Sequence, residues 1–234
     1  MNFLSSKFLD VNRQIRQAAE AAGRDPREIT LIGASKTQSA ETIAKAYAAG
    51  LRHVGENYLD EAIAKRAQFQ ASDLVWHFIG RIQSNKTRLI AAHFDWAHTV
   101  DREKIASRLS KHRSGPPLNV LIQVNIDADQ AKAGVLPDEA HALVDFTSTL
   151  PNLRLRGLMT ILSQTSTPES SYQSVAQLAA RLKATLPSVQ REAWDTLSMG
   201  MSGDLDAAIA AGATHVRIGT ALFGPRPSRG DVED

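Results

Sequence analysis

Short runs of apolar and β-branched residues alternate with longer stretches of helical periodicity along almost the whole chain. Apolar runs between turn residues predict buried strands, and apolar positions that repeat every three to four residues predict helices. Eight strands are expected, over residues 28–35, 51–55, 74–80, 95–100, 118–126, 153–159, 195–200 and 214–219. Helical segments separate them, over residues 39–50, 56–70, 84–94, 101–113, 136–150, 168–185 and 202–213. This alternation predicts βαβ units and a parallel sheet.

An additional helix is expected before the first strand, over about residues 4–22. Its apolar residues recur on one helical face, at Phe3, Leu4, Phe8, Val11 and Ile15. Charged residues interrupt the apolar run that a signal peptide would need, and no window approaches the roughly 18 apolar residues of a membrane span. We therefore expect a soluble, cytoplasmic protein without a membrane partner.

The number of strand–helix repeats favours one particular α/β architecture. Eight repeats in 234 residues indicate a single (β/α)8 TIM-type barrel more strongly than an open doubly wound sheet. The first predicted strand is not followed by a G-x-G-x-x-G fingerprint, which makes a dinucleotide-binding sheet less favoured. No stretch has the composition of a linker. We expect one domain over residues 1–234, with a frayed tail from about residue 227.

Composition removes several classes of function. The 27 basic and 25 acidic residues give a net charge of +2, so bulk electrostatics give no reason to expect a nucleic-acid partner. The absence of cysteine excludes disulfides, thiolate metal sites and a cysteine nucleophile. The pair Asp127 and Asp129 lacks the further ligands that a metal site requires, and we expect no metal.

Polar residues follow most of the predicted strands. In a barrel of this type the carboxyl ends of the strands form the active-site rim, so these residues are expected to meet there. They are Lys36, Glu56, Asn57, His77, Gly80, Asn125, Met159, Thr160, the stretch 198–202, Arg217, Gly219 and Thr220. From its position alone, His77 is more typical of a buried core histidine than of a catalytic residue.

Two glycine-hydroxyl turns, in SMGMSGD and RIGTALFG, follow strands seven and eight. A helix expected to begin near Ser202 would present unpaired N–H groups to an anion. Gly219 would let the main chain approach that anion, and Thr220 could donate its hydroxyl. Phosphate sites recur at this place in barrels. The alternative is that Gly200, Gly203 and Gly219 serve only as tight-turn residues.

Lys36 and Arg217 extend this hypothesis to a particular ligand. A desolvated lysine forms a Schiff base with an aldehyde, and an aldehyde that carries a phosphate suggests pyridoxal 5′-phosphate. The alternative is an ordinary lysine whose stem covers the rim. Arg217 interrupts an apolar run and therefore needs a polar partner. That partner is either a pyridine nitrogen, which an arginine keeps unprotonated, or an acid such as Glu56 or Asp204.

The motifs together resemble, along nearly the whole chain, the pyridoxal phosphate homeostasis protein family, which is similar to the alanine racemase N-terminal domain. The matching stretches are SKTQ, HVGENYLDEAIAK, WHFIGRIQSNK, LIQVNID, LRGLMTI and LSMGMSGDLDAAIAAGATHVRIGTALFG. The resemblance implies a barrel that holds pyridoxal 5′-phosphate as an internal aldimine on Lys36, with Arg217 at the pyridine nitrogen. It also implies further cofactor contacts from Ser202, Gly219, Thr220, Ser198, Met199, Asn57 and His77, and Met159 joins them as the end of the sixth strand.

The expected function is to hold the cofactor in intracellular homeostasis, with delivery to apo-enzymes as a further expectation. Racemisation needs a second acid–base group opposite the lysine, and Tyr58 is the one tyrosine expected near the rim. Because no racemase-type second domain is expected, we also expect a monomer. A weak amino-acid racemase and a sugar-phosphate lyase with a Schiff-base lysine remain the alternatives.

Overall fold

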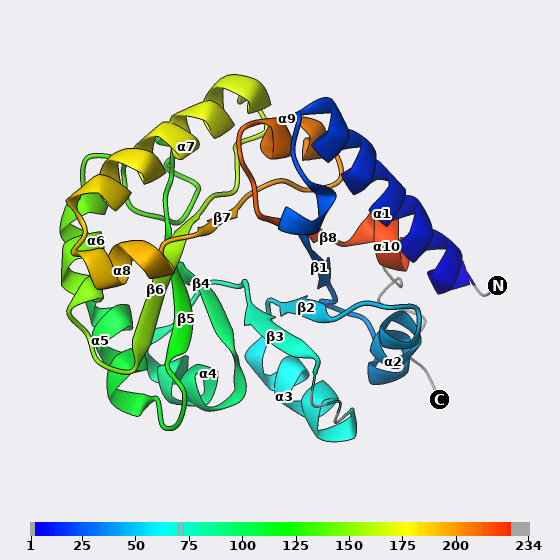
Figure 1. The fold of residues 1–234 in the computed structure, drawn as a ribbon. Helices are drawn as coiled ribbons and strands as arrows, with labels where there is room; N and C mark the ends of the chain where they lie inside the picture. The colour runs from blue at the N-terminus through cyan, green and yellow to red at the C-terminus, as the bar shows by residue number, and fades with distance from the viewer. Residues whose placement is uncertain (1–2, 70, 72, 226–234) are drawn as a thin grey trace.

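The computed structural model describes residues 3–69, 71 and 73–225, and in it eight parallel strands close into a barrel in chain order, with β1 beside β8 (Figure 1). The strands are β1 (Thr30–Ala34), β2 (His53–Glu56), β3 (Val75–Phe78), β4 (Trp96–Val100), β5 (Leu118–Gln123), β6 (Leu153–Met159), β7 (Thr196–Ser198) and β8 (His215–Ile218). Each overlaps a predicted strand, and only β2 extends beyond its prediction, by one residue, so the expected TIM-type barrel is confirmed. The predicted frayed tail lies outside the described residues.

Helices form a ring around the strands (Figure 1). They are α1 (Phe3–Ala21), α2 (Ala40–Ala48), α3 (Leu59–Gln68), α4 (Thr87–His93), α5 (Glu103–His112), α6 (Ala140–Ser148), α7 (Pro168–Thr185), α8 (Ser188–Ala193), α9 (Leu205–Ala210) and α10 (Thr220–Phe223). Short 3-10 turns occupy Pro26–Glu28 and Ser84–Lys86. Helices α8 and α10 were not predicted, because six and four residues are too few to show a helical period. Among these described helices, none combines the length and the apolar character needed to cross a membrane.

The predicted N-terminal helix is present as α1, and it completes the outer layer of the barrel. It packs against α9, α10 and α2, close to the junction of β8 and β1 (Figure 1). Val11 and Ile15 are buried in this contact, whereas Phe3 remains exposed. Since α9 and α10 are short, the 19 residues of α1 cover apolar surface that these two helices leave open.

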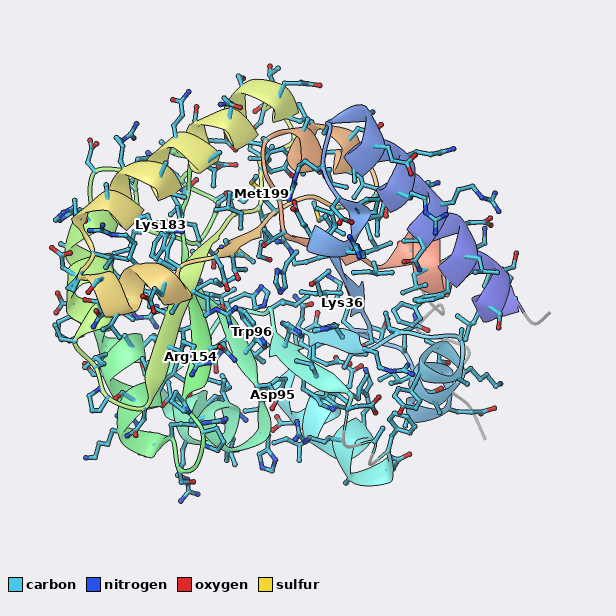
Figure 2. All side chains as sticks on the ribbon, viewed as in Figure 1. Lys36, Asp95, Trp96, Arg154, Lys183 and Met199 are labelled. Atoms are coloured by element: carbon cyan, nitrogen blue, oxygen red, sulfur yellow. The ribbon has the colours of Figure 1, made fainter. Side chains whose placement is uncertain are left out.

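Side chains alternate between the two faces of each strand. The fold therefore has two interiors, one between the strands and the helices and one inside the barrel. Outward-facing residues such as Val54 and Val216 join the large apolar core between strands and helices. Inside the barrel, Trp96 packs with Leu121 and Met159 in a smaller apolar cluster. Figure 2 shows Trp96 in the middle of the ring of helices. The rest of the barrel interior contains polar side chains that form part of the site described below.

Several predicted boundaries are wrong by a few residues, and two of them lie near the site. Strand β5 ends at Gln123 and not near Asn125, because the chain turns there to pair with Val135. The Asn125 N–H donates to the Val135 carbonyl at 2.9 Å. The predicted helix start near Ser202 is also too early, since α9 begins at Leu205. Residues 202–204 form a separate turn instead.

Candidate functional site

Lys36 lies in a tight turn directly beyond β1, at the carboxyl ends of the strands. The Ser35 N–H still pairs with Gly55 of β2 at 2.9 Å, and the Gln38 N–H closes the turn on the Ser35 carbonyl at 3.0 Å. Thr37 has a φ of 66°, a conformation that is uncommon for a β-branched residue. The turn keeps Lys36 half-buried at the barrel mouth.

Two acids, Glu56 and Glu61, approach this turn from elsewhere in the fold, although no acid neighbours Lys36 in sequence. Glu61 of α3 accepts a hydrogen bond from the Thr37 N–H at 2.7 Å. Glu56, at the end of β2, is fully buried and accepts a hydrogen bond from the Ser35 hydroxyl at 2.6 Å. Lys65 of α3 donates to Glu56 at 2.8 Å and to the Ser35 carbonyl at 2.7 Å. Burial raises the pKa of Glu56 against the lowering effect of Lys65. Sequence reasoning did not select Lys65.

Arg217 comes from β8, the neighbour of β1, where it is paired with Ile32 in the strand register. Its guanidinium donates to the Ser198 hydroxyl and to the Thr160 carbonyl, each at 2.8 Å. Burial lowers the pKa of Arg217 to about 10, so the side chain remains a cation at neutral pH. The structure therefore brings Lys36 and Arg217 into one sector of the mouth.

The alternative of a structural ion pair for Arg217 is not observed among the described residues. Glu56 is paired with Lys65. Asp204 accepts a hydrogen bond from the Tyr172 hydroxyl at 2.8 Å and another from the Met201 N–H at 2.6 Å. Arg217 is thus held by a hydroxyl and a carbonyl, both neutral acceptors.

Three histidines form a hydrogen-bonded row inside the barrel, here called the histidine chain: His53, His77 and His98. His53 Nδ1 lies 3.0 Å from His77 Nε2, and His77 Nδ1 lies 2.9 Å from His98 Nε2. His98 Nδ1 is in turn 2.9 Å from the Ser198 hydroxyl. The row runs from the first residue of β2 to the last residue of β7, so it ends at the hydroxyl that also contacts Arg217.

The histidine chain is uncharged. Burial, reinforced by neighbouring positive groups, places the pKa of His77 and of His98 well below its usual value. A neutral imidazole has one donor and one acceptor nitrogen, so the hydrogen bonds of the row must all run in the same direction. His77 was predicted beside the ligand ring, and the structure places it in the barrel interior, linked to Ser198 through His98.

His53, His98 and His215 are polar interior residues that the sequence analysis did not select. His98 follows Trp96 by two positions in β4, and His215 precedes Arg217 by two in β8. Period-two alternation therefore assigned both to the inner face, and this signal could have identified them. Among the described residues, no group of three histidines or acids has a geometry suited to a metal ion.

The two glycine turns differ in what their glycines do. Gly200 has a φ of 96°, and a Cβ there would lie 2.6 Å from the Cβ of Ala208, so it is a turn residue. Gly203 would meet nothing within 4 Å, and Gly219 would meet only Ala34, at 3.6 Å or more. Neither has a positive φ. The missing side chains at Gly203 and Gly219 leave open space of the kind that an approaching anion needs.

The hydroxyl residues of these turns are accessible. Ser202 is exposed in the turn before α9, and Thr220 is exposed as the first residue of α10. The first N–H groups of a helix have no acceptor within the helix, which leaves the main chain after Gly219 able to donate to an anion. These features fit a phosphate group, although both helices are too short for a large dipole.

The three remaining predicted residues, Asn57, Met159 and Met199, lie in different parts of the fold. Asn57 is half-buried beyond β2, and its Oδ1 is buried without a hydrogen-bond partner among the described residues. Such an orphaned acceptor is rare in a folded protein and fits a site that a ligand completes. Met159 lies inside the barrel beside Trp96. The side chain of Met199 belongs to the apolar core between strands and helices, on the other face of β7 from Ser198.

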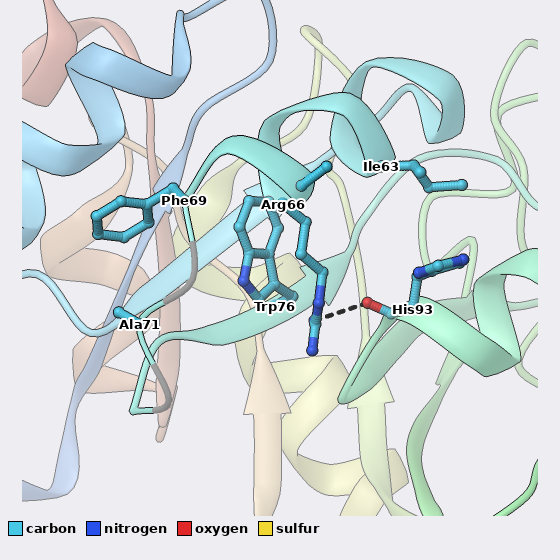
Figure 3. Close-up of a pocket in the computed structure, with 7 residues that line it drawn as sticks. Ile63, Arg66, Phe69, Ala71, Trp76 and His93 are labelled. Atoms are coloured by element: carbon cyan, nitrogen blue, oxygen red, sulfur yellow. Dashed lines mark hydrogen bonds between the residues drawn. The ribbon is translucent and has the colours of Figure 1, made fainter.

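A separate hollow lies in the outer layer, between the ends of α3 and α4 (Figure 3). Arg66 donates to the His93 carbonyl at 2.8 Å across it, and its guanidinium lies over the Trp76 ring at 5.8 Å. The carboxyl ends of the helices, where this hollow lies, are next to the amino ends of the strands. It is therefore remote from Lys36 and carries none of the chemistry described above.

The fold and the site define a class of protein. Residues 11–227 match the family model described as alanine racemase, N-terminal domain, and the chain belongs to this family. The pyridoxal phosphate homeostasis protein of Pseudomonas aeruginosa is 52% identical over 230 residues, which cover 97% of each chain. The protein of the same name from Escherichia coli K12 is 48% identical over 234 residues, covering 97% of this chain and 98% of the relative. The predicted resemblance to pyridoxal phosphate homeostasis proteins is confirmed.

Solved structures agree with this assignment. PipY of Synechococcus elongatus, solved without pyridoxal phosphate, superposes with a TM-score of 0.79 at 38% identity, covering 90% of this chain and 99% of PipY. PipY with pyridoxal phosphate bound gives 0.77 at 37% identity, with coverages of 90% and 100%. Alanine racemase from Corynebacterium glutamicum gives 0.64 at 16% identity over 95% of this chain and 62% of the racemase, which shows a shared fold alone.

Proposed function

We propose that this chain binds pyridoxal 5′-phosphate at the mouth of its barrel, through Lys36, and serves the homeostasis of that cofactor. The observation that carries the proposal is the pairing of β1 with β8, which brings Lys36, Arg217 and Gly219 to one sector of the rim. The names of the relatives and the ligand of PipY support it.

The cofactor would supply an aldehyde that condenses with an amine and a ring that absorbs visible light once it is joined to the protein. Lys36 would hold the cofactor covalently, because its neutral amine could condense with the aldehyde and release water. Arg217 has five N–H donors, two of which serve Ser198 and Thr160, so others remain for a ring nitrogen. An arginine there keeps that nitrogen unprotonated.

The phosphate of the cofactor would be bound by the two glycine turns. The space beside Gly203 and Gly219 admits the group close to the main chain, and the hydroxyls of Ser202 and Thr220 can donate to it. The buried Oδ1 of Asn57 would gain a partner nearer the ring. Together these contacts fix the ligand at both ends, with Lys36 as the covalent attachment.

The arrangement of the tyrosines supports a protein that holds the cofactor over one that uses it for catalysis. The Tyr172 hydroxyl is bonded to Asp204, and the Tyr47 hydroxyl donates to Asp73 at 2.5 Å. Burial raises the pKa of Tyr172, which keeps its hydroxyl protonated at neutral pH, so it is not available as a base. Tyr58 is at the rim but exposed. A weak racemase would need Tyr58 as the acid–base group opposite Lys36, and this stays the alternative.

The cellular setting belongs to the same proposal. A protein that binds its cofactor in a defined pocket, with a net charge of +2, suits a monomeric carrier in the cytoplasm. Its partners would be apo-enzymes that accept pyridoxal 5′-phosphate. Mixing the loaded protein with such an apo-enzyme, and comparing the rate of reactivation with that of free cofactor, tests this part.

One titration tests the binding proposal. Purified protein mixed with pyridoxal 5′-phosphate should develop a visible absorption band, and borohydride should fix the cofactor to Lys36, as read by peptide mass. Lys36→Ala should lose the band, and Arg217→Glu should shift it. A wild-type protein that binds no cofactor, or that is labelled at another lysine, would overturn the proposal. Rapid exchange of the alanine α-proton would favour the racemase.

A further inference from the structure

The turn that carries Lys36 is bonded on both sides to side chains of one helix. Lys65 of α3 donates to the Ser35 carbonyl at 2.7 Å, immediately before Lys36. Glu61, one helical turn earlier in α3, accepts from the Thr37 N–H at 2.7 Å, immediately after it. Glu61 and Lys65 are themselves ion-paired. The helix therefore contacts the main chain of both neighbours of Lys36 and fixes the direction in which its side chain leaves the turn.

Glu56 ties this arrangement to the sheet. It accepts from the Ser35 hydroxyl at 2.6 Å and from Lys65 at 2.8 Å, so strand β2, helix α3 and the turn share one set of bonds. Glu56, Glu61 and Lys65 are here called the charged network. The side chains of Glu56 and Lys65 are 0% and 6% exposed.

Such burial is costly for stability alone. Apolar residues of similar volume are often as stabilising as a buried ion pair, since desolvation offsets the attraction. Apolar side chains could not, however, donate to the Ser35 carbonyl or accept from the Thr37 N–H. The charged network therefore provides directional bonds to the main chain that packing cannot supply.

The conformation of Thr37 supports this reading. A β-branched residue in the left-handed region is strained, so this conformation persists only where neighbouring contacts fix it. The Thr37 φ of 66° coincides with the bond from its N–H to Glu61. Strain and a dedicated hydrogen bond thus occur together, one residue from the proposed nucleophile.

We infer that Glu61 and Lys65, joined by Glu56, are positioning residues for Lys36: they hold its turn so that Nζ points at the aldehyde carbon of the ligand. The inference rests on the proposed function. It assigns these residues to bond formation alone, because the phosphate contacts and the Arg217 contact with the ring nitrogen come from β7, β8 and the turns that follow them.

The experiment compares two ligands that differ only at the reacting carbon. Pyridoxal 5′-phosphate carries the aldehyde, and pyridoxine 5′-phosphate carries an alcohol that cannot join to an amine. Glu61→Ala removes the acceptor for Thr37, whereas Glu61→Gln keeps an oxygen there. We expect Glu61→Ala to slow formation of the visible band by about tenfold or more, since a small misplacement of a reacting group has effects of that size. Its affinity for pyridoxine 5′-phosphate should stay within about twofold, and Glu61→Gln should recover most of the rate.

Lys45→Met serves as the matched control. Lys45 and Glu41 form the same i,i+4 ion pair on α2, at 2.7 Å, but away from the Lys36 turn. This variant should match the wild type with both ligands. An equal loss of affinity for both ligands in Glu61→Ala, or an unchanged rate of band formation, would overturn the inference. Failure of the proposed function looks different, because the wild type would then bind neither ligand.

Discussion

Two buried polar networks support the mouth of the barrel, and they differ in charge. The charged network lies outside the strands, between β2, α3 and the Lys36 turn, and it contains full ion pairs. The histidine chain lies inside the barrel and is neutral, because burial lowers the pKa values of His77 and His98. The first contacts the main chain beside Lys36, and the second reaches Arg217 through Ser198.

The difference follows from what each network has to hold. A main-chain turn with a positive φ needs strong bonds, and hydrogen bonds to ionised groups are about twice as strong as neutral ones. Arg217 is already a buried cation, so a second positive charge beside it would be repulsive. Neutral imidazoles supply hydrogen bonds there without adding charge. Removing a partner should therefore be more damaging in the charged network than in the histidine chain.

The largest expected effect comes from Lys65→Met. This change leaves Glu56 buried without its cation, and breaking a buried pair in this way costs about 3–5 kcal/mol. The measurement is the free energy of unfolding from chemical denaturation near neutral pH. Glu56→Gln/Lys65→Met removes both charges and should regain much of the loss. If the double variant were as unstable as the single one, the charge of Glu56 would not be the cause.

A smaller effect is expected from His98→Leu, which breaks the histidine chain. The substitution leaves a nitrogen of His77 without a partner, and an unsatisfied buried polar group costs about 1–3 kcal/mol. His98→Asn keeps a polar atom near Ser198, and His98→Gln keeps one near His77, so each should lose less than leucine does. A loss in His98→Leu larger than that in Lys65→Met would reverse the comparison.

The positions of these networks show what the sequence could and could not predict. Lys36, Arg217 and Gly219 end strands with strong apolar patterns, and the barrel rule was enough to place them at one rim. Lys65 was not predicted because its contacts with Ser35 and Glu56 depend on how α3 packs, and helical periodicity does not encode that packing. Met199 follows β7 as expected, and the alternation of side chains turns its side chain toward the helices, so its contact with the ligand stays a prediction.

The histidine chain was missed for a related reason. A polar residue in a short apolar strand is a single departure from the apolar pattern and indicates no partner. His77 was therefore interpreted alone, as either a core residue or a ligand contact. The row depends on three strands in register, with His77 paired to Trp96 across β3 and β4. Neighbouring strands bring the histidines of β2, β3 and β4 together, and only the closed barrel brings His98 of β4 to Ser198 of β7. Short helices such as α10 remained unpredicted because they contain too few residues for a period.

Lowering the pH should change the contributions of the two networks to the free energy of unfolding in opposite directions. The unfolded chain binds protons at its histidines near pH 6.5, whereas folded His77 and His98 remain neutral well below it. Stability from these residues is therefore present above about pH 6.5 and falls on acidification, by about 1.4 kcal/mol per pH unit for each neutral histidine. His53 and His215, whose pKa values are also lowered by burial, contribute in the same direction. Unfolding free energies measured on the acid side should show a shallower slope for His98→Leu.

Glu56 should act in the opposite direction. Because burial raises its pKa, the folded protein takes up this proton more readily than the unfolded chain does. Its contribution to stability is therefore greatest at low pH and is lost as the pH rises through the raised value. Glu56→Gln should make the acid loss steeper, whereas His98→Leu makes it shallower. Equal slopes in the two variants would contradict the assignment of the acid response to the histidine chain.

The smallest effect is expected where an ion pair has the spacing of Glu61 and Lys65 but not their burial. Lys45 and Glu41 are 55% and 76% exposed, so solvent screens their attraction. Lys45→Met should leave the free energy of unfolding close to that of the wild type in the same denaturation experiment, with a still smaller difference in high salt. A loss comparable to that of Lys65→Met would mean that helical pairing as such, and not contact with the Lys36 turn and Glu56, accounts for the charged network.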